Sequence, residues 1–381
     1  MREIALIGLT QSLFFIFLIL SKKDKEQKDY FLSLFLFFVA AELLYRFLIN
    51  TIPESENKWL ALFDIFYWST FGPITLLYIR FTIKKQDKVK WIDLVYTIPL
   101  VISLYGIKDF FFGSIKYNSF IGYFNNTVGL TKAALYFWEF CSPVVLIYCL
   151  YILWKHNKAI KYYFSDESKY NLGWLIILLS VFVFYLLLSY SVWILNGLFG
   201  LSIFFSSLDL LPYILTGYVF VIGFFGYKQG GVFSKELIVQ KQRAQIKQSS
   251  KEDKYKKSGL SEDERKTLVG RLKFIMETEK PFIEYDLNIL DLSKMLETSV
   301  NKLSQVINES FHKNFYNFVN YHRIEEVKKL LKDPENQKFT IISIAYDCGF
   351  NSKSSFYSFF KQNTGTTPKE YLEKNSISKS H

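Results

Sequence analysis

Cysteine and histidine are both rare in this chain of 381 residues, which has three of the first and four of the second. They are Cys141, Cys149, Cys348, His156, His312, His322 and His381. The cysteines lack the paired spacing of a disulfide frame or a zinc site, and the histidines lack the spacing of metal ligands or a catalytic triad. A sensor kinase needs a phosphoacceptor histidine in a helical dimer and a glycine-rich nucleotide loop, and the sequence has neither. We therefore expect no enzymatic activity, no metal and no cofactor.

The first twenty residues lack the small-residue cleavage site that ends a secretory signal peptide. Lys22 and Lys23 follow the apolar run directly, so we interpret this run as a first membrane-spanning helix. Half of all residues are hydrophobic, including 39 Phe and 26 Tyr, and this surplus suggests contact with lipid. The long apolar runs end at Tyr227, and the sequence beyond it is polar and periodic. We place a domain boundary there.

Seven apolar stretches are long enough to cross a bilayer, since about twenty residues rising roughly 1.5 Å each span a hydrocarbon layer of about 30 Å. Their approximate bounds are 4–21, 30–49, 59–83, 91–107, 133–154, 172–195 and 204–227. The sequence therefore predicts an all-α protein, in which a seven-helix transmembrane bundle over residues 1–227 is followed by a soluble helical domain.

Lysine is distributed unevenly among the loops between these stretches. The loops after the first, third and fifth stretches carry twelve lysines, and those after the second, fourth and sixth carry four. Because cytoplasmic loops are enriched in Lys and Arg, this alternation predicts an N-terminus outside and a C-terminal half in the cytoplasm. We therefore expect a multi-pass protein of the bacterial inner membrane, in contact with the lipid bilayer.

Ionisable residues within the predicted spans are costly and usually face a bundle interior or a cavity. Five stand out, namely Glu42, Arg46, Asp64, Glu139 and Asp209. With the orientation above they share the outer half of the membrane. We hypothesise that they line an outward-facing pocket for an unknown extracellular or intramembrane signal, with Arg46 as the counter-charge. The alternative is that they only hold helices together, with Glu42 and Arg46 paired one turn apart.

Residues 228–260 are polar and rich in Lys, Gln and Ser, with few side chains that build a core. Nine basic and three acidic residues lie between Lys228 and Lys257, in a chain whose net charge is +11. These cations could rest on anionic lipid. The apolar residues of this segment are too sparse for a sustained heptad pattern, which leaves a dimerising coiled coil open. We interpret the segment as a cytoplasmic basic linker.

The region after the linker contains amphipathic helix patterns with recognisable caps. Ser261 and Glu264 have capping-box spacing, and apolar residues then line one face up to about Glu279. A short helix ending near Glu297 follows, and Ser299 is placed to cap a third helix. Two short helices a few residues apart, the second with a free outer face, are typical of a helix-turn-helix unit.

The short pair recurs after a longer amphipathic helix over residues 315–331. Gly349 supplies a turn residue that tolerates positive φ, and Ser352 is placed to cap a helix whose phenylalanines face inward. A last short helix follows. We therefore expect residues 261–375 to form a domain with two helix-turn-helix units, followed by a tail over residues 376–381.

These residues resemble the AraC/XylS type of transcription regulator, in its form fused to a membrane sensor. The resemblance extends over roughly residues 268–371 and is most specific in the second half. There it is carried, in order and at the family's spacing, by Ile344, Ala345, Gly349, Phe350, Ser355, Phe356, Phe360, Lys361, Gly365, Pro368 and Tyr371. The first half matches at Leu292, Leu296, Ser299, Leu303, Ser304, Arg323, Leu330 and Leu331. The resemblance implies that one monomer inserts two recognition helices into successive major grooves, about one helical turn apart.

Carried over by position, the resemblance also implies which side chains meet DNA. Amides can read adenine edges and lysine can address guanine. The base-reading candidates are Asn301, Lys302, Ser304 and Gln305 in the first recognition helix, and Lys353, Ser354, Tyr357 and Ser358 in the second. The phosphate candidates are Ser299, Arg323, Ser352 and Lys361. Each exposed polar residue could instead belong to a solvated helix face.

Three positions depart from the family's pattern. Glu297 stands where the family usually has Gly, so the backbone there either avoids positive φ or loses about 1 kcal/mol. Ser293 replaces the usual Ala, and Ser358 stands where Arg is frequent. We therefore expect specific binding to depend more on the first unit, through Gln305, than on the second.

The resemblance implies a membrane-bound transcription factor, an activator by its family type, that couples a sensed signal to sequence-specific promoter binding. Its partners would be double-stranded DNA, RNA polymerase in the case of an activator, and a second copy of the chain if it dimerises. The alternative is a transporter or a sequestering membrane protein whose soluble domain serves only to bind a partner. Against a transporter, the seven spans show no convincing internal repeat.

Overall fold

The computed structural model describes residues 2–49, 60–83, 89–112, 123, 126–167, 171–199, 210–228, 260–336 and 338–377. Most of the predicted linker therefore lies outside the described residues, together with the last four residues of the tail. The described segments are helical, and the extended pairing among them is one isolated antiparallel bridge. The all-helical fold predicted from the sequence is confirmed.

The chain divides into two compact units. Unit 1 comprises Met1–Trp154 and Leu172–Phe233, and unit 2 comprises Lys155–Asn171 and Ser234–His381. The segment that follows the fifth predicted span thus groups with the C-terminal domain.

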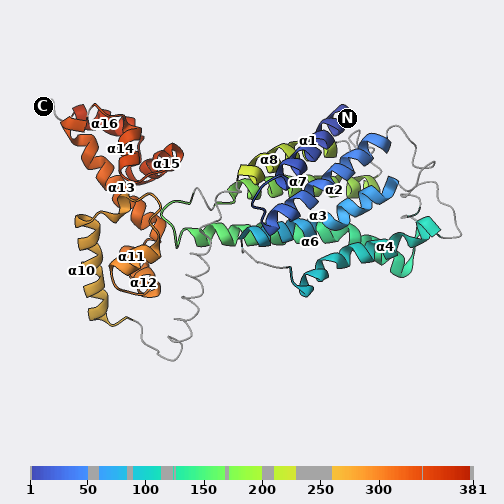
Figure 1. Cartoon of the computed structure of the whole chain (residues 1–381), viewed down its shortest axis with the longest axis horizontal. Coiled ribbons are helices and arrows are strands. Elements are labelled where there is room, and N and C mark those ends of the chain that lie inside the picture. The colour runs from blue at the N-terminus through green and yellow to red at the C-terminus, as the bar shows by residue number, and fades with distance from the viewer. Residues whose placement is uncertain are drawn as a thin grey trace. The chain divides into compact units, whose positions relative to one another are not determined.

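Unit 1 contains apolar helices that correspond to the seven predicted spans (Figure 1). They are α1 (Arg2–Leu20), α2 (Gln27–Ile49), α3 (Ala61–Ile83), η2 (Trp91–Thr97) continued by α4 (Ile98–Phe112), α6 (Gly129–Ile160), α7 (Gly173–Phe199) and α8 (Leu211–Lys228). The fourth predicted span is therefore a 3-10 turn followed by an α-helix. Among the described residues, six helices are long and apolar enough to cross a membrane, and α8 is a shorter apolar helix.

The core of unit 1 gathers apolar side chains from α1, α2, α3, α6, α7 and α8. Tyr67, Phe71 and Phe182 are almost inaccessible there, and the rings of Phe71 and Phe182 lie 4.5 Å apart. The outer faces are apolar as well, since Phe17 and Phe184 are 67% and 69% exposed. Helices that are hydrophobic both toward their neighbours and away from them suit lipid better than water.

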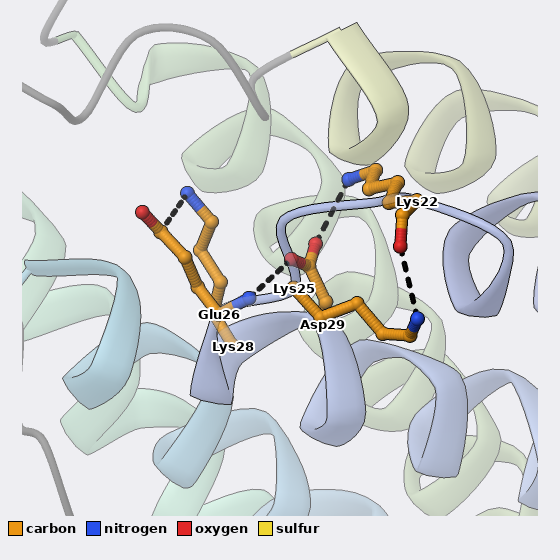
Figure 2. Close-up of polar contacts among 5 residues, drawn as sticks. All are labelled: Lys22, Lys25, Glu26, Lys28 and Asp29. Carbon is orange, nitrogen blue, oxygen red and sulfur yellow. Dashed lines mark hydrogen bonds and ion pairs between the residues drawn. The ribbon is translucent and has the colours of Figure 1, made fainter.

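Ion pairs hold the connection between α1 and α2 (Figure 2). Asp29 accepts hydrogen bonds from Lys22 Nζ at 2.8 Å and from the backbone N–H of Glu26 at 2.9 Å. Lys28 pairs with Glu26 at 3.0 Å, and Lys25 donates to the carbonyl of Lys22 at 2.9 Å. Asp29 therefore satisfies a backbone donor at the start of α2, where the helix itself offers no acceptor.

Unit 2 is built from short helices around one longer helix. They are α10 (Glu262–Thr278), η6 (Pro281–Ile283), α11 (Ile289–Met295), α12 (Val300–Phe311), α13 (Phe315–Lys332), η7 (Pro334–Asn336), α14 (Ile341–Asp347), α15 (Lys353–Thr364) and α16 (Pro368–Ile377). The predicted capping box is present, since the side chains of Ser261 and Glu264 each accept the other's backbone N–H at 3.2 Å. Ser299 and Ser352 cap α12 and α15, as predicted.

The long helix α13 contributes to two hydrophobic cores (Figure 1). Its first half packs with α10, η6, α11 and α12 through Phe315, Phe318 and Val319. Its second half packs with α14 and α15 through Ile324, Val327 and Leu331. A shared middle helix therefore joins the pair α11 and α12 to the pair α14 and α15, which is the arrangement that the resemblance implied.

Residues 163–167, which we call the docking segment, pair with the chain just before α11. The backbone N–H of Ile289 donates to the Tyr163 carbonyl at 3.0 Å, and that of Ser165 donates to the Leu287 carbonyl at 3.1 Å. Phe164 forms the antiparallel bridge with Asn288 between these two bonds. No sequence pattern predicted this pairing, because the segment is a short loop between two predicted spans.

Candidate nucleic-acid interface

Helix α12, which the sequence predicts to be the first recognition helix, has one buried and one accessible face. Its buried side chains are Leu303, Val306 and Ile307. On the other face Lys302 pairs with Glu264 at 3.5 Å, and Gln305 Nε2 donates to Glu309 at 2.9 Å. The backbone N–H of Ser261, and after it the charge of Lys302, lower the pKa of the Glu264 carboxyl. An exposed ion pair such as Lys302–Glu264 contributes little to stability.

The other predicted base readers of α12 share the accessible side. Asn301 and Ser304 are half-buried, and Asn308 donates to the Ser304 carbonyl at 2.8 Å. Asn308 is exposed and stands one turn beyond Ser304, so it belongs to the same face although the sequence analysis did not name it. The helical spacing of positions 301, 304, 305 and 308 is the signal that could have found it.

Helix α15, which the sequence predicts to be the second recognition helix, buries its phenylalanines and exposes polar residues of its first turn. The buried residues are Phe356, Phe359 and Phe360. Lys353, Ser354 and Ser358 are exposed, whereas Tyr357 is half-buried with Lys353 Nζ 5.8 Å from its ring centre. Ser354 and Ser358 line an open pocket of about 420 Å³, to which α13 and Glu167 of the docking segment also contribute.

Three of the four phosphate candidates are placed where phosphate could reach them. Ser299 and Ser352 stand at the N-termini of the two recognition helices, where backbone N–H groups attract anions. Lys361 is exposed near the end of α15.

Arg323, the fourth phosphate candidate, is buried, with an exposed fraction of 1%. Its Nε donates to the Phe282 carbonyl at 2.7 Å, and its Nη2 donates to the Glu284 carbonyl at 2.8 Å. Its Nη1 donates to Asn320 Oδ1 at 3.1 Å and to the Ser165 carbonyl at 3.3 Å. Burial lowers the pKa of Arg323 to about 10, which leaves it protonated near neutral pH. The predicted phosphate contact is wrong for this structure, because backbone carbonyls enclose the guanidinium.

The turns of both helix-turn-helix units use positive φ. Gly349 has φ of +90°, and a Cβ added there would lie 2.4 Å from the Phe282 carbonyl oxygen. Glu297 has φ of +50°, so of the two outcomes expected for this position the strained one, worth about 1 kcal/mol, is found.

Three of the predicted sensory residues meet within unit 1. Arg46 Nε donates to Glu42 Oε1 at 2.7 Å, and Arg46 Nη2 donates to Asp64 Oδ1 at 2.7 Å. Trp68 Nε1 donates to the same Asp64 oxygen at 3.2 Å. The expected pair one turn apart on α2 is therefore present, and α3 adds a second carboxylate. Asp209 and the side chain of Glu139 lie outside the described residues.

Residues 292–374 match the helix-turn-helix domain family. Similar proteins occur in Staphylococcus aureus strains COL, MSSA476 and N315, and each is named an uncharacterized HTH-type transcriptional regulator. Each is 38% identical over 86 residues, which is 23% of this chain but only 11% of the relative. No solved structure matches the chain. The C-terminal part of the chain therefore carries an AraC-type helix-turn-helix domain, as its residues predicted.

Proposed function

We propose that this chain is a membrane-bound transcription regulator that couples a signal sensed by unit 1 to sequence-specific promoter binding by unit 2. The observation that carries the proposal is the joining, in one chain, of seven apolar helices to two helix-turn-helix units on a shared middle helix. Helix-turn-helix units place their second helix in the major groove. The fold class and the apolar helices together favour a regulator that acts at the membrane.

The accessible faces of α12 and α15 support base reading. Gln305 can bond an adenine edge through its amide, and Lys302 and Lys353 can donate to guanine. With Ser358 in place of a longer side chain, α15 offers fewer such groups than α12. Specific recognition then depends chiefly on the first unit, and the second adds phosphate contacts through its N-terminus and Lys361.

The proposed location is the bacterial inner membrane with unit 2 in the cytoplasm. The lysine-rich loops after the first, third and fifth spans support this orientation. The role of activator, with RNA polymerase as its partner, rests on the family resemblance alone.

The proposed sensory element is the cluster of Glu42, Arg46 and Asp64. A cation held by two carboxylates within apolar helices is sensitive to any polar ligand or proton that reaches it. Arg46→Met should therefore alter the response to signal while the protein still inserts into the membrane. Arg2→Met, at the start of α1, is a matched control for loss of an arginine. A normal response to signal in both variants would mean that the cluster only holds helices together.

The test of the proposed function is recovery of promoter DNA with the intact chain from membranes of cross-linked cells. We expect a small set of promoters to be enriched, and the double variant Lys302→Ala with Gln305→Ala to lose that enrichment. Glu335→Ala with Glu373→Ala, two exposed changes outside the recognition helices, should keep it. Equal recovery from all three proteins, together with substrate uptake into cells, would favour the transporter alternative instead.

A further inference from the structure

The docking segment, which is itself part of unit 2, packs beside the first helix-turn-helix unit. Tyr163 packs against the core formed by α10, α11 and α12, and Phe164 is 7% exposed. Ser165 is 1% exposed and its Oγ donates to the Leu287 carbonyl at 2.7 Å, beside the backbone pairing already described. Because buried groups make these hydrogen bonds, the segment is packed into the domain and is not a loose surface loop.

The same segment is fixed to the middle helix α13. The Ser165 carbonyl accepts hydrogen bonds from Asn320 Nδ2 at 3.1 Å and from Arg323 Nη1 at 3.3 Å, and its Oγ accepts from Arg323 Nη2 at 3.1 Å. Asn320 is 2% exposed and uses the same amide to bond the Tyr316 carbonyl at 3.0 Å. A serine held by two buried polar side chains is an anchor, since releasing it would leave both with fewer partners.

The acidic end of the segment reaches the second recognition helix. Asp166 Oδ2 accepts a hydrogen bond at 3.2 Å from the side chain of Asn351, which precedes the cap of α15. Glu167 lines the pocket with Ser354 and Ser358. Lys161, from the same loop, lies 3.7 Å from Glu167 and offsets part of its charge. Two carboxylates therefore stand where the resemblance places DNA.

Asp166 and Glu167 lie near the N-terminal end of α15, and this position determines their effect on DNA binding. The N-terminal residues of a recognition helix face the base edges, and the N–H groups there favour a phosphate oxygen. Asp166 and Glu167 lie beside this end of α15, and their negative charges repel a phosphate oxygen there. Docking of this segment and full engagement of α15 with DNA are therefore competing events.

We propose that the docking segment is an internal competitor of DNA, anchored by Ser165 and opposing DNA at α15 through Asp166 and Glu167. This inference rests on the proposed function, because it takes α15 to be a DNA-binding helix. The segment lies between α6 and α7 in the chain. A change in those two helices therefore reaches α15 through the docking segment, independently of the basic linker that joins α8 to α10.

Hydrogen exchange of the full chain in lipid nanodiscs tests the docking. Without DNA the backbone N–H groups of Ser165 and Ile289 should be protected, and a saturating duplex that the chain binds should speed exchange of Ser165. Free exchange of Ser165 without DNA would overturn the proposal, and so would exchange that bound DNA leaves unchanged. Failure of the wild-type chain to bind any duplex would instead contradict the proposed function.

Duplex titrations of the same nanodiscs test the charge. Asp166→Asn with Glu167→Gln should bind duplex about two- to tenfold more tightly than the wild-type chain, as expected for removing two half-buried carboxylates that repel phosphate. Glu335→Gln with Glu373→Gln, which removes two carboxylates elsewhere on unit 2, should stay within about twofold because salt screens distant charges. Equal affinities for the two double variants would show that the docking segment does not oppose DNA.

Discussion

Arg323 and Ser165 lie 158 residues apart in the chain and share two hydrogen bonds, from Nη1 to the serine carbonyl at 3.3 Å and from Nη2 to its Oγ at 3.1 Å. The same guanidinium bonds carbonyls next to the first helix-turn-helix unit and lies 5.9 Å from the ring centre of Phe350 in the second. One buried cation therefore links both halves of the domain to the docking segment.

Loss of the Arg323 side chain should destabilise unit 2 strongly. Arg323→Met leaves the carbonyls of Phe282 and Glu284 without these donors in a buried site, and we expect a loss of about 3 to 5 kcal/mol. Hydrogen exchange of α13 in the full chain measures it. Arg271→Met is the control, because Arg271 is half-exposed and 3.8 Å from Glu297, and it should cost less than about 1 kcal/mol. Similar losses in the two variants would contradict the structural role of Arg323.

Substituting each of two glycines at positive φ distinguishes the cost of backbone strain from the cost of steric overlap. A Cβ at Gly349 would meet two carbonyl oxygens of η6 at 2.4 and 2.6 Å, whereas one at Gly365 would meet no atom within 4 Å. Gly365→Ala should therefore cost about 1 kcal/mol, and Gly349→Ala should cost clearly more because η6 must shift. The free energy of unfolding of unit 2 gives both values, and equal costs would argue against the close contact.

Glu297 allows the reverse substitution, in which glycine replaces a residue at positive φ. Because its φ is +50°, Glu297→Gly should stabilise unit 2 by up to about 1 kcal/mol, less a small loss from the exposed pair with Arg271. The same unfolding measurement applies, and a loss of stability would mean that the glutamate has a role that its contacts do not reveal.

Unit 2 should lose stability as pH falls toward 4. Burial lowers the pKa of His322 from 6.5 to about 4. Between pH 6.5 and pH 4, His322 is therefore protonated in the unfolded chain and neutral in the folded chain. The loss between about pH 6.5 and 4.5 should reach roughly 2 kcal/mol. His322→Gln should remove it. Below about pH 4.5 both proteins should weaken further, because backbone hydrogen bonds lower the carboxyl pKa values of Glu264 and Glu370.

Specific DNA binding should depend on Gln305 more than on Ser358. Gln305→Ala removes an amide that can bond a base edge and should cost about 1 to 3 kcal/mol of specific binding. Ser358→Ala should cost much less, because serine is too short to replace the arginine that is frequent there. Duplex titrations at one fixed salt concentration give both values, and the reverse ranking would show that the second unit leads recognition.

The parts of the fold that the sequence predicts are those with local signals. The caps at Ser261, Ser299 and Ser352 each depend on groups within three residues, and helix periodicity is likewise local. The burial of Arg323 was not predicted, because the backbone carbonyls that enclose its guanidinium lie 38 to 158 residues away in the chain. The pairing of the docking segment was not predicted for the same reason, since nothing in its own residues distinguishes it from an exposed loop.

The most direct measurement is duplex selection with the intact chain held in lipid nanodiscs. The account predicts insertion into the bilayer and enrichment of duplexes that carry two half-sites about one helical turn apart, with an affinity that falls steeply as salt rises. A well-folded, inserted chain that retains no duplex even at low salt would contradict it.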